Sequence, residues 1–117
     1  MGHDNFLRFA DKGRVETPCF VVDKALIRKN LKVIKDVIDR TDCKVVLALK
    51  AFSMYSTFGL INKTLCGTCA TSVNEARLGR EEFGGEVHVF GAAYSEKDFK
   101  ELLELADHID FNFLLAL

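Results

Sequence analysis

Lys50 is the residue whose type and position point most directly to chemistry. It follows an apolar run, Val45–Leu49, that has the pattern of a buried strand. Parallel α/β folds place their sites at the carboxyl ends of strands. A lysine that loses hydration there is held as a neutral amine, which attacks an aldehyde to form a Schiff base. A lysine whose ammonium group simply extends into water is the alternative, and position alone does not decide between them.

Other polar residues are better explained by structure than by catalysis. Ser72 and Glu75 have the spacing of a capping box, in which two side chains satisfy free backbone N–H groups at a helix start. The positive end of that helix could also help to hold an anionic group. His88 lies within an expected strand, and we expect neither His3 nor His108 to form a cluster with it.

The cysteines and glycines do not indicate a metal or nucleotide site. Cys66 and Cys69 have C-x-x-C spacing, but a structural zinc site needs a second close pair of ligands. Cys19 and Cys43 stand alone, so we expect reduced, mostly buried thiols and no metal. The glycines form neither G-x-G-x-x-G nor a Walker loop.

Composition narrows the class of protein. The chain has 117 residues, 49% of them hydrophobic, and its 16 basic and 17 acidic residues nearly balance. Such a chain has no basic stripe for nucleic acid or an anionic membrane. Its apolar stretches are far shorter than the roughly 20 residues of a spanning helix, and its first residues do not have the pattern of a secretory signal. We therefore expect a cytoplasmic protein with no nucleic acid or membrane partner.

Hydrophobic patterns predict strands and helices in alternation. Strands are expected at residues 19–22, 44–49, 68–71, 87–90 and 109–112, and helices at about 24–38, 53–65, 72–83 and 95–106. The helices have clear end signals, namely N-caps at Asp23, Ser72 and Ser95 and a terminating Gly84-Gly85. Two helices should bury one apolar face each, the first with Ile27, Leu31, Ile34 and Ile38 and the last with Phe99, Leu102, Leu103 and Ala106.

This alternation predicts an α/β fold with a parallel sheet. Strands about 20 residues apart, each followed by a helix, pair in parallel through right-handed crossovers. A doubly wound sheet and a (β/α)₈ barrel share the pattern, and a complete barrel needs about 250 residues. As a barrel, the chain would hold roughly the first five strands and four helices. The apolar residues 113–117 would then follow an unpaired edge, as in a chain cut short.

Three segments together resemble one enzyme family: Thr17–Asp23 (TPCFVVD), Leu47–Ser53 (LALKAFS) and Thr71–Val89 (TSVNEARLGREEFGGEVHV). The T-P-x-x-V-x-D opening and the A-x-K motif are shared by the pyridoxal-phosphate-dependent alanine-racemase-like group, which includes ornithine, arginine and diaminopimelate decarboxylases. The narrower L-K-A-F-S and E-A-R-L-G-R-E-E-F-G-G-E-V-H-V stretches are similar to the amino-terminal part of carboxynorspermidine decarboxylases.

The resemblance implies a cofactor, an activity and a domain plan. It implies a leader at residues 1–16 and, at 17–117, the amino-terminal part of a TIM-like barrel that binds pyridoxal 5'-phosphate. A β-rich carboxyl-terminal domain and a homodimer would complete the enzyme. In that picture Lys50 binds the cofactor, and Ala48 packs beside its ring. The activity would be decarboxylation of carboxynorspermidine or carboxyspermidine to norspermidine or spermidine in polyamine biosynthesis.

Two alternatives stay open. The parent protein could be another barrel-type pyridoxal-phosphate enzyme, such as diaminopimelate decarboxylase or a racemase, or it could be a non-catalytic module for cofactor binding or interaction. Cys69 falls near where ornithine-type relatives carry an aspartate, so this chain departs from those relatives at that position. In this family the ring-stacking histidine, the glycine-rich phosphate loop and the acidic partner of the pyridine nitrogen come from later strands.

Overall fold

Strands and helices alternate along the chain in the computed structural model, which describes residues 16–112. In chain order the elements are α1 (Lys24–Thr41), β1 (Val46–Ala48), η2 (Tyr55–Thr57), α2 (Phe58–Ile61), β2 (Gly67–Ala70), α3 (Val73–Leu78), η3 (Gly79–Phe83), β3 (Glu86–Gly91), α4 (Glu96–Leu105) and β4 (His108–Phe111). The predicted α/β class is confirmed.

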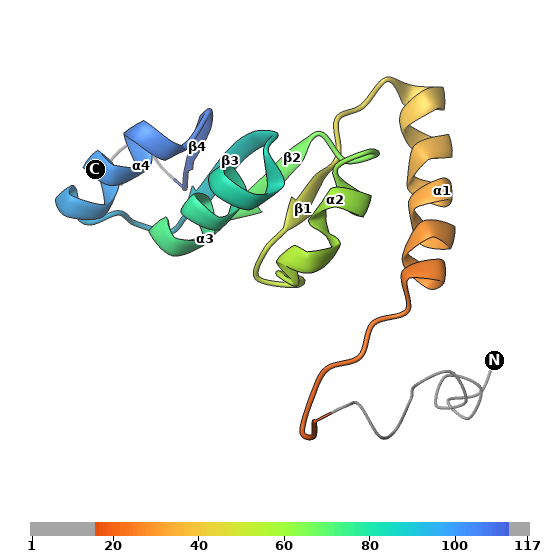
Figure 1. The fold of residues 1–117 in the computed structure, drawn as a ribbon. Coiled ribbons are helices and arrows are strands. Elements are labelled where there is room, and N and C mark those ends of the chain that lie inside the picture. Colours follow the sequence, from red (N-terminus) through yellow and green to blue (C-terminus); the bar gives the residue numbers. More distant parts are fainter. Residues whose placement is uncertain (1–15, 113–117) are drawn as a thin grey trace.

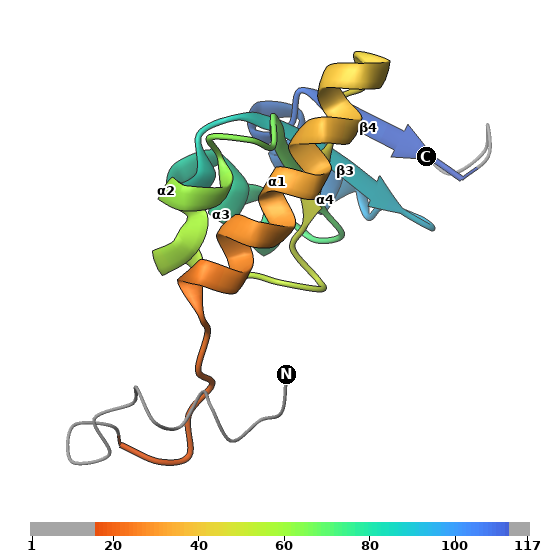
Figure 2. The same ribbon diagram turned by 90° about the vertical axis from the view of Figure 1, so that its right-hand side faces the viewer.

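The four strands form one parallel sheet in the order β1-β2-β3-β4. Helices α2, α3 and α4 line up along one side of this sheet (Figure 1), as the view turned by 90° also shows (Figure 2). A doubly wound sheet would reverse its strand order near the middle, whereas a barrel adds each strand beside the last. The observed order is therefore that of consecutive barrel strands, and the partial (β/α)₈ barrel itself stays a prediction.

The two faces of the sheet differ in burial. Along β3, Val87 and Val89 are buried against the helices, whereas His88 between them is half-buried on the opposite face. The register pairs Ala48 with Cys69, Cys69 with His88 and His88 with His108. Side chains in such a row share one face of a sheet. We call this side, marked by Ala48, Cys69, His88 and His108, the open face.

The hydrophobic core lies between the other face of the sheet and the helices. Phe58 of α2 and Phe83 of η3 meet edge to face with ring centroids 5.4 Å apart, and both are almost fully buried. Leu102 of α4 is buried beside them in the same core cluster. Each such side chain stabilises the fold by roughly 1.5–3 kcal/mol relative to an exposed one, so the helices are held to the sheet mainly by apolar contact.

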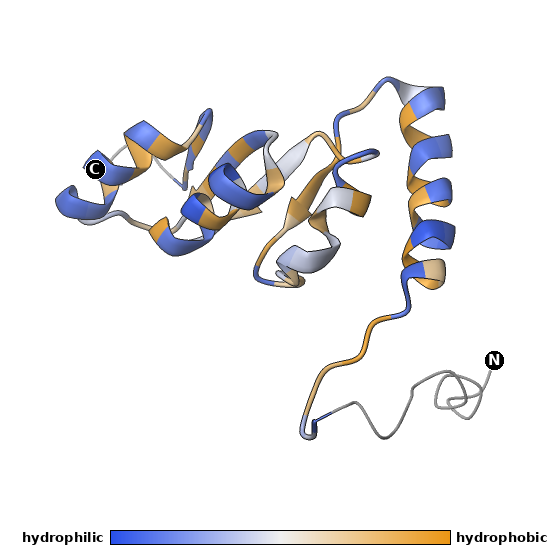
Figure 3. Ribbon diagram, viewed as in Figure 1, coloured by the Kyte–Doolittle hydropathy of each residue, from blue (hydrophilic) through white to orange (hydrophobic). Residues whose placement is uncertain are grey.

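Helix α1 confirms the prediction made from its periodicity. Asp23 caps it by accepting a hydrogen bond from the backbone N–H of Ala25 at 2.7 Å. Leu31 is buried, and Ile27 and Ile34 pack against the core. Figure 3 shows the polar residues of α1 on the side away from the rest of the protein. The amphipathic pattern thus places this helix correctly.

The predicted first strand at residues 19–22 is wrong. The segment before α1 has no strand, Phe20 is 95% exposed, and the chain there runs away from the sheet (Figure 1). A strand gains its hydrogen bonds from a neighbour, and in the described residues this segment does not pair with β1. The sheet accordingly has four strands where we expected five.

Smaller differences concern the helices. The helix expected at residues 53–65 is reduced to η2 and α2, and the third helix continues as the π-helix η3 until Gly84, whose φ is 74°. In α4, Leu103 is 59% exposed, and Leu105 packs against the core instead. No described helix is long and apolar enough to cross a membrane. The expected leader, apart from Glu16, and the apolar residues 113–117 lie outside the described range.

Candidate functional site

Lys50 lies in the turn that directly follows β1, at the carboxyl edge of the sheet. The turn is fixed by backbone bonds, because the N–H groups of Ala51 and Phe52 both donate to the carbonyl of Ala48, at 3.0 and 3.1 Å. Leu49 is buried, and its N–H donates to the carbonyl of Cys69 at 3.0 Å. The amine of Lys50 is therefore carried on a well-anchored turn.

Of the two alternatives for Lys50, the described part of the chain shows the one in which its side chain extends into water. Lys50 is exposed. Its apolar neighbours do not bury it, because Leu49 points into the core while Lys50 does not. Dehydration of this amine would need a cover over the open face, which the described elements do not supply.

Ala48 occupies the open face two residues before Lys50 and in register with Cys69. Its methyl group is the smallest side chain that still has a Cβ atom, so a flat group can approach the sheet closely at this point. The structure thus places both predicted site residues, Ala48 and Lys50, within one short stretch at the carboxyl end of β1.

Charged groups surround the thiol of Cys69. Partial burial raises the pKa of Cys69, the negative charge of Asp110 raises it further, and Glu75 adds a smaller rise. The positive charge of Lys50 opposes the rise without reversing it. Charged groups from the turn after β1, from α3 and from β4 are therefore close enough to act on the thiol of Cys69. Sequence reasoning missed Asp110 and undervalued Cys69, although both lie at or near the carboxyl ends of expected strands.

Tyr94 connects two parts of this carboxyl edge. Its hydroxyl donates a hydrogen bond to the backbone carbonyl of Asp110 at 2.7 Å. Burial raises the pKa of Tyr94, so the phenol stays a neutral donor. Its ring also packs edge-on against Phe111, with centroids 5.6 Å apart. These contacts tie the loop after β3 to β4. In the sequence, only the position of Tyr94 after a predicted strand could have indicated them.

The capping interpretation of Ser72 and Glu75 is confirmed with one difference. Ser72 accepts a hydrogen bond from the Glu75 N–H at 3.2 Å, as in a capping box. The Glu75 carboxylate, however, accepts from the N–H and hydroxyl of Thr71, at 2.7 and 2.9 Å. These bonds fix the start of the six-residue helix α3. The anion-binding role that we considered for this helix start gains no support.

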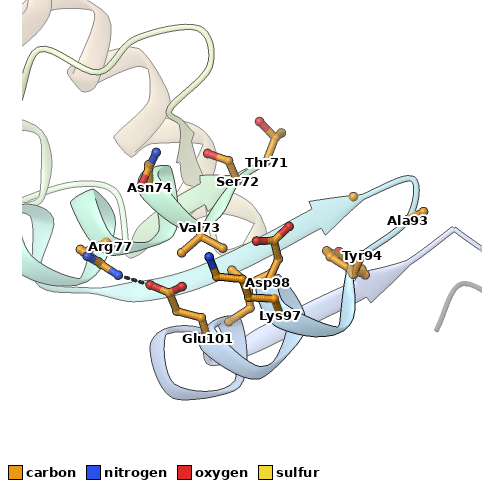
Figure 4. Close-up of a pocket in the computed structure, with 12 residues that line it drawn as sticks. Thr71, Ser72, Val73, Asn74, Arg77, Ala93, Tyr94, Lys97, Asp98 and Glu101 are labelled. Atoms are coloured by element: carbon orange, nitrogen blue, oxygen red, sulfur yellow. Dashed lines mark hydrogen bonds and ion pairs between the residues drawn. The ribbon is translucent and has the colours of Figure 1, made fainter.

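A polar pocket lies between α3 and α4, on the helix side of the sheet (Figure 4). Asn74 and Arg77 line it from α3, Lys97 and Glu101 line it from α4, and Arg77 forms an ion pair with Glu101. Lys50 and Ala48 are not among its lining residues. The pocket is therefore separate from the candidate site on the open face.

The expectation that His88 has no histidine partner is wrong. The imidazole rings of His88 and His108 stack on the open face with centroids 4.4 Å apart and planes 24° from parallel. Nε2 of His88 also lies 3.1 Å from Oε2 of Glu86. The two histidines are 20 residues apart in the sequence, and only the register of β3 and β4 brings them together.

The cysteines are unpaired, as expected, but less buried than expected. Cys19 and Cys43 are exposed, because the predicted first strand is not formed and Cys43 lies before β1 begins. Cys66 and Cys69 are half-buried, and Cys66 donates a weak hydrogen bond to the carbonyl of Val45 at 3.3 Å. The C-x-x-C pair thus belongs to the packing around β2.

Comparisons with known proteins show similarity to carboxynorspermidine/carboxyspermidine decarboxylases and to a carboxyaminopropylagmatine decarboxylase. The chain is 38% identical over 98 residues to a carboxynorspermidine/carboxyspermidine decarboxylase from Herminiimonas arsenicoxydans, covering 84% of the chain and 27% of that protein. It is 37% identical over 110 residues to carboxyaminopropylagmatine decarboxylase from Synechocystis sp., covering 94% of the chain and 28% of that protein. No protein-family model matches the chain.

The fold is also similar to a solved structure. The crystal structure of carboxynorspermidine decarboxylase from Campylobacter jejuni, complexed with norspermidine, matches with a TM-score of 0.81 at 29% identity, over 86% of this chain and 27% of that one. The resemblance noted from the motifs is therefore confirmed in sequence and in fold. The chain spans about 27% of the length of the relatives that it matches.

Proposed function

We propose that this chain, similar over most of its length to carboxynorspermidine/carboxyspermidine decarboxylases, is a segment of a pyridoxal 5'-phosphate-dependent decarboxylase. Its substrate would be carboxynorspermidine or carboxyspermidine, and its products norspermidine or spermidine, within polyamine biosynthesis. The observation that carries the proposal is the amine of Lys50 at the carboxyl end of β1, inside a segment whose fold matches such an enzyme with a TM-score of 0.81.

The described residues fit the attachment of this cofactor. Lys50 would hold it through its amine, since a primary amine at a strand end can bond to an aldehyde. Ala48 would lie under the ring, where its small side chain leaves space on the open face. When bound, pyridoxal phosphate supplies an electron sink for the charge left when carbon dioxide departs. Cys69, in register with Ala48, would border the same space.

The domain plan is part of the same proposal. Residues 17–117 would form the amino-terminal part of a TIM-like barrel, which the consecutive order of four parallel strands supports. Closure of a barrel would cover the open face and remove water from Lys50, which favours its neutral amine. A homodimer in the cytoplasm would be the working form, supported by the family resemblance alone, and sedimentation velocity of the complete enzyme checks the assembly.

Borohydride trapping tests the role of Lys50. The chain is incubated with pyridoxal phosphate and reduced, and the modified lysines are identified by peptide mass spectrometry. Lys44 is the internal comparison, because it lies six residues earlier at the other end of the same strand region. Its ion pair with Glu86 raises the pKa of Lys44 and keeps its amine protonated. We expect modification to concentrate at Lys50 and to be lost in Lys50→Ala.

Two results would count against the proposal. Equal modification of many surface lysines, unchanged in Lys50→Ala, would show that this segment forms no selective site. In the complete enzyme, we expect Lys50→Ala to lose decarboxylation and Lys44→Ala to retain it. Full activity of Lys50→Ala would exclude the lysine as the cofactor anchor.

A second substrate has a specific observation in its favour. The Synechocystis relative, at 37% identity over 94% of the chain, is named as a carboxyaminopropylagmatine decarboxylase. The two substrate assignments are separated by measuring carbon dioxide release by the complete enzyme. The compounds compared at matched concentrations are carboxynorspermidine, carboxyspermidine and carboxyaminopropylagmatine. We expect the highest kcat/KM with one of the first two compounds. Turnover of diaminopimelate instead would favour another barrel-type enzyme such as diaminopimelate decarboxylase. Cofactor binding without any turnover would favour a non-catalytic module.

A further inference from the structure

Three metal-ligating side chains meet on the open face at the amino ends of β3 and β4. Glu86 and His108 are the first residues of their strands, and the register pairs His88 with His108. One ligand atom from each of the three residues can be chosen so that all lie within 4.8 Å of one another. Imidazole nitrogen and carboxylate oxygen are the donors that zinc and related divalent ions bind.

One pair of these ligand atoms already has the spacing of a coordination shell. Metal–ligand bonds of about 2.1 Å at tetrahedral angles place two ligand atoms about 3.4 Å apart. Nε2 of His88 and Oε2 of Glu86 are already 3.1 Å apart. The ring of His108, which is stacked on His88, must turn about its side-chain torsions so that one of its nitrogens faces the same point.

We propose that Glu86, His88 and His108 form a binding site for a divalent transition-metal ion such as Zn²⁺, with water in the remaining coordination position. Binding would replace the contact between His88 and Glu86 by two bonds to the metal. Coordination needs a lone pair on Nε2 of His88: in the neutral ring a proton on Nε2 moves to Nδ1, and in the imidazolium it is released to solvent while Nδ1 keeps its own. No covalent bond of the protein is broken.

Lys44 controls this site. Its ammonium group forms an ion pair with Oε1 of Glu86, while Oε2 faces His88. The carboxylate can therefore offer one oxygen to a metal and keep the other on Lys44. The positive charge of Lys44 beside a second cation is unfavourable, so the lysine weakens metal binding. Its side chain is largely exposed, which allows it to move into solvent when the metal arrives.

The site is separate from the proposed cofactor lysine. It is built on β3 and β4, and Lys50 follows β1, two strands away in the hydrogen-bonding direction, or about 10 Å at the usual strand spacing. The metal proposal consequently does not depend on the proposed function, and trapping at Lys50 can fail or succeed without affecting it.

Titration of the reduced 117-residue chain with Co²⁺ and Zn²⁺ tests the site. We expect one ion per chain, with a visible Co²⁺ spectrum that lacks the charge-transfer band of thiolate ligands. His108→Gln and Glu86→Gln should weaken binding by at least roughly 10- to 100-fold, the range seen when even the groups that support metal ligands are lost. Lys44→Met should tighten it several-fold. The double variant of Cys66→Ser with Cys69→Ser, and separately His3→Ala, are the controls and should leave the affinity unchanged.

Three results would overturn the proposal. One is the absence of saturable binding, and another is an affinity that His108→Gln and Glu86→Gln do not change. The third is a thiolate charge-transfer band that disappears in the cysteine double variant, which would place the metal on the cysteines. Circular dichroism checks that each variant is folded. Because Lys44→Met and Glu86→Gln are expected to change affinity in opposite directions, general unfolding cannot imitate the pattern.

Discussion

Asp107 and Val87 exchange two hydrogen bonds where β3 and β4 begin. The Asp107 carboxylate accepts a bond from the Val87 N–H at 2.7 Å, and the Asp107 N–H donates to the Val87 carbonyl at 2.9 Å. The same carboxylate accepts from Arg80 at 2.8 Å, and Arg80 also donates to the carbonyl of Leu105 at 2.9 Å. The side chains of Asp107 and Arg80 together join β3, η3 and the end of α4.

Asp107→Asn is expected to destabilise the fold in a pH-dependent way. The bond from Val87 is the main cause that lowers the pKa of Asp107, and Arg80 lowers it further. Because the folded pKa lies below the unfolded one, the stabilisation is complete above the unfolded pKa and is lost as pH falls through the folded pKa. We expect a loss of about 1 kcal/mol at neutral pH, discounted for exposure, and almost none at an acidic pH below the folded pKa.

Urea denaturation at both pH values measures this difference. Asp110→Asn, in the strand that follows Asp107, is the matched control. Among the described residues the Asp110 carboxylate accepts no side-chain or turn hydrogen bond, whereas its backbone carbonyl accepts one from Tyr94. A loss in Asp107→Asn that is independent of pH, or one that Asp110→Asn equals, would contradict the assigned role.

Thr68→Val and Thr57→Val should shift stability in opposite directions. Both threonines are buried. The Thr68 hydroxyl has no hydrogen-bond partner among the described residues, whereas the Thr57 hydroxyl donates to the carbonyl of Met54 at 2.8 Å. Replacing a buried, unpaired hydroxyl by a methyl group removes a desolvation cost, so Thr68→Val should gain about 1 kcal/mol, and Thr57→Val should lose about as much. Thermal unfolding measures both, and equal losses would show that the Thr68 hydroxyl is satisfied.

Local chemistry in the sequence predicted the helix starts well. Asp23, Ser72 and Ser95 each accept a hydrogen bond from a backbone N–H one turn ahead, as their types and positions indicated. A cap depends on residues two or three positions apart, so a single sequence contains all that is needed. Lys50 was placed correctly at a strand end for the same reason, since the apolar run before it is a local signal.

Features that depend on distant neighbours could not be predicted. The stacking of His88 on His108 follows from strand register, which a single sequence does not contain. The sequence pattern that suggested a cluster of metal-ligating residues was instead the C-x-x-C spacing of Cys66 and Cys69. The apolar segment around Phe20 has every local property of a strand but no partner strand in the described residues. Exposure of Lys50 likewise depends on what covers the open face, which the residues beside it do not determine.

Gly84→Ala and Gly59→Ala form a second matched pair. Gly84 ends η3 with a φ of 74°, a conformation that costs an L-residue about 1 kcal/mol or more. Gly59 lies in α2, and a Cβ atom there would meet nothing within 4 Å. Alanine should therefore lower the free energy of unfolding at Gly84 and raise it by about 0.5–1 kcal/mol at Gly59. Guanidinium denaturation gives both values, and a neutral result at Gly84 would mean that the helix end rearranges freely.

Cysteine alkylation should be ordered by the environment of each thiol. Cys43 is exposed, whereas Cys69 is half-buried, and burial is the main cause that raises the pKa of Cys69. The thiolate is the reactive form, so at mildly alkaline pH we expect iodoacetamide to modify Cys43 several-fold faster than Cys69. Raising the pH should accelerate the reaction of Cys69, and in concentrated urea the two rates should converge. Timed mass spectrometry of the peptides measures both rates. Equal rates in the folded chain would mean that Cys69 is freely open to solvent. The thiol that borders the proposed cofactor space would then not be partly buried.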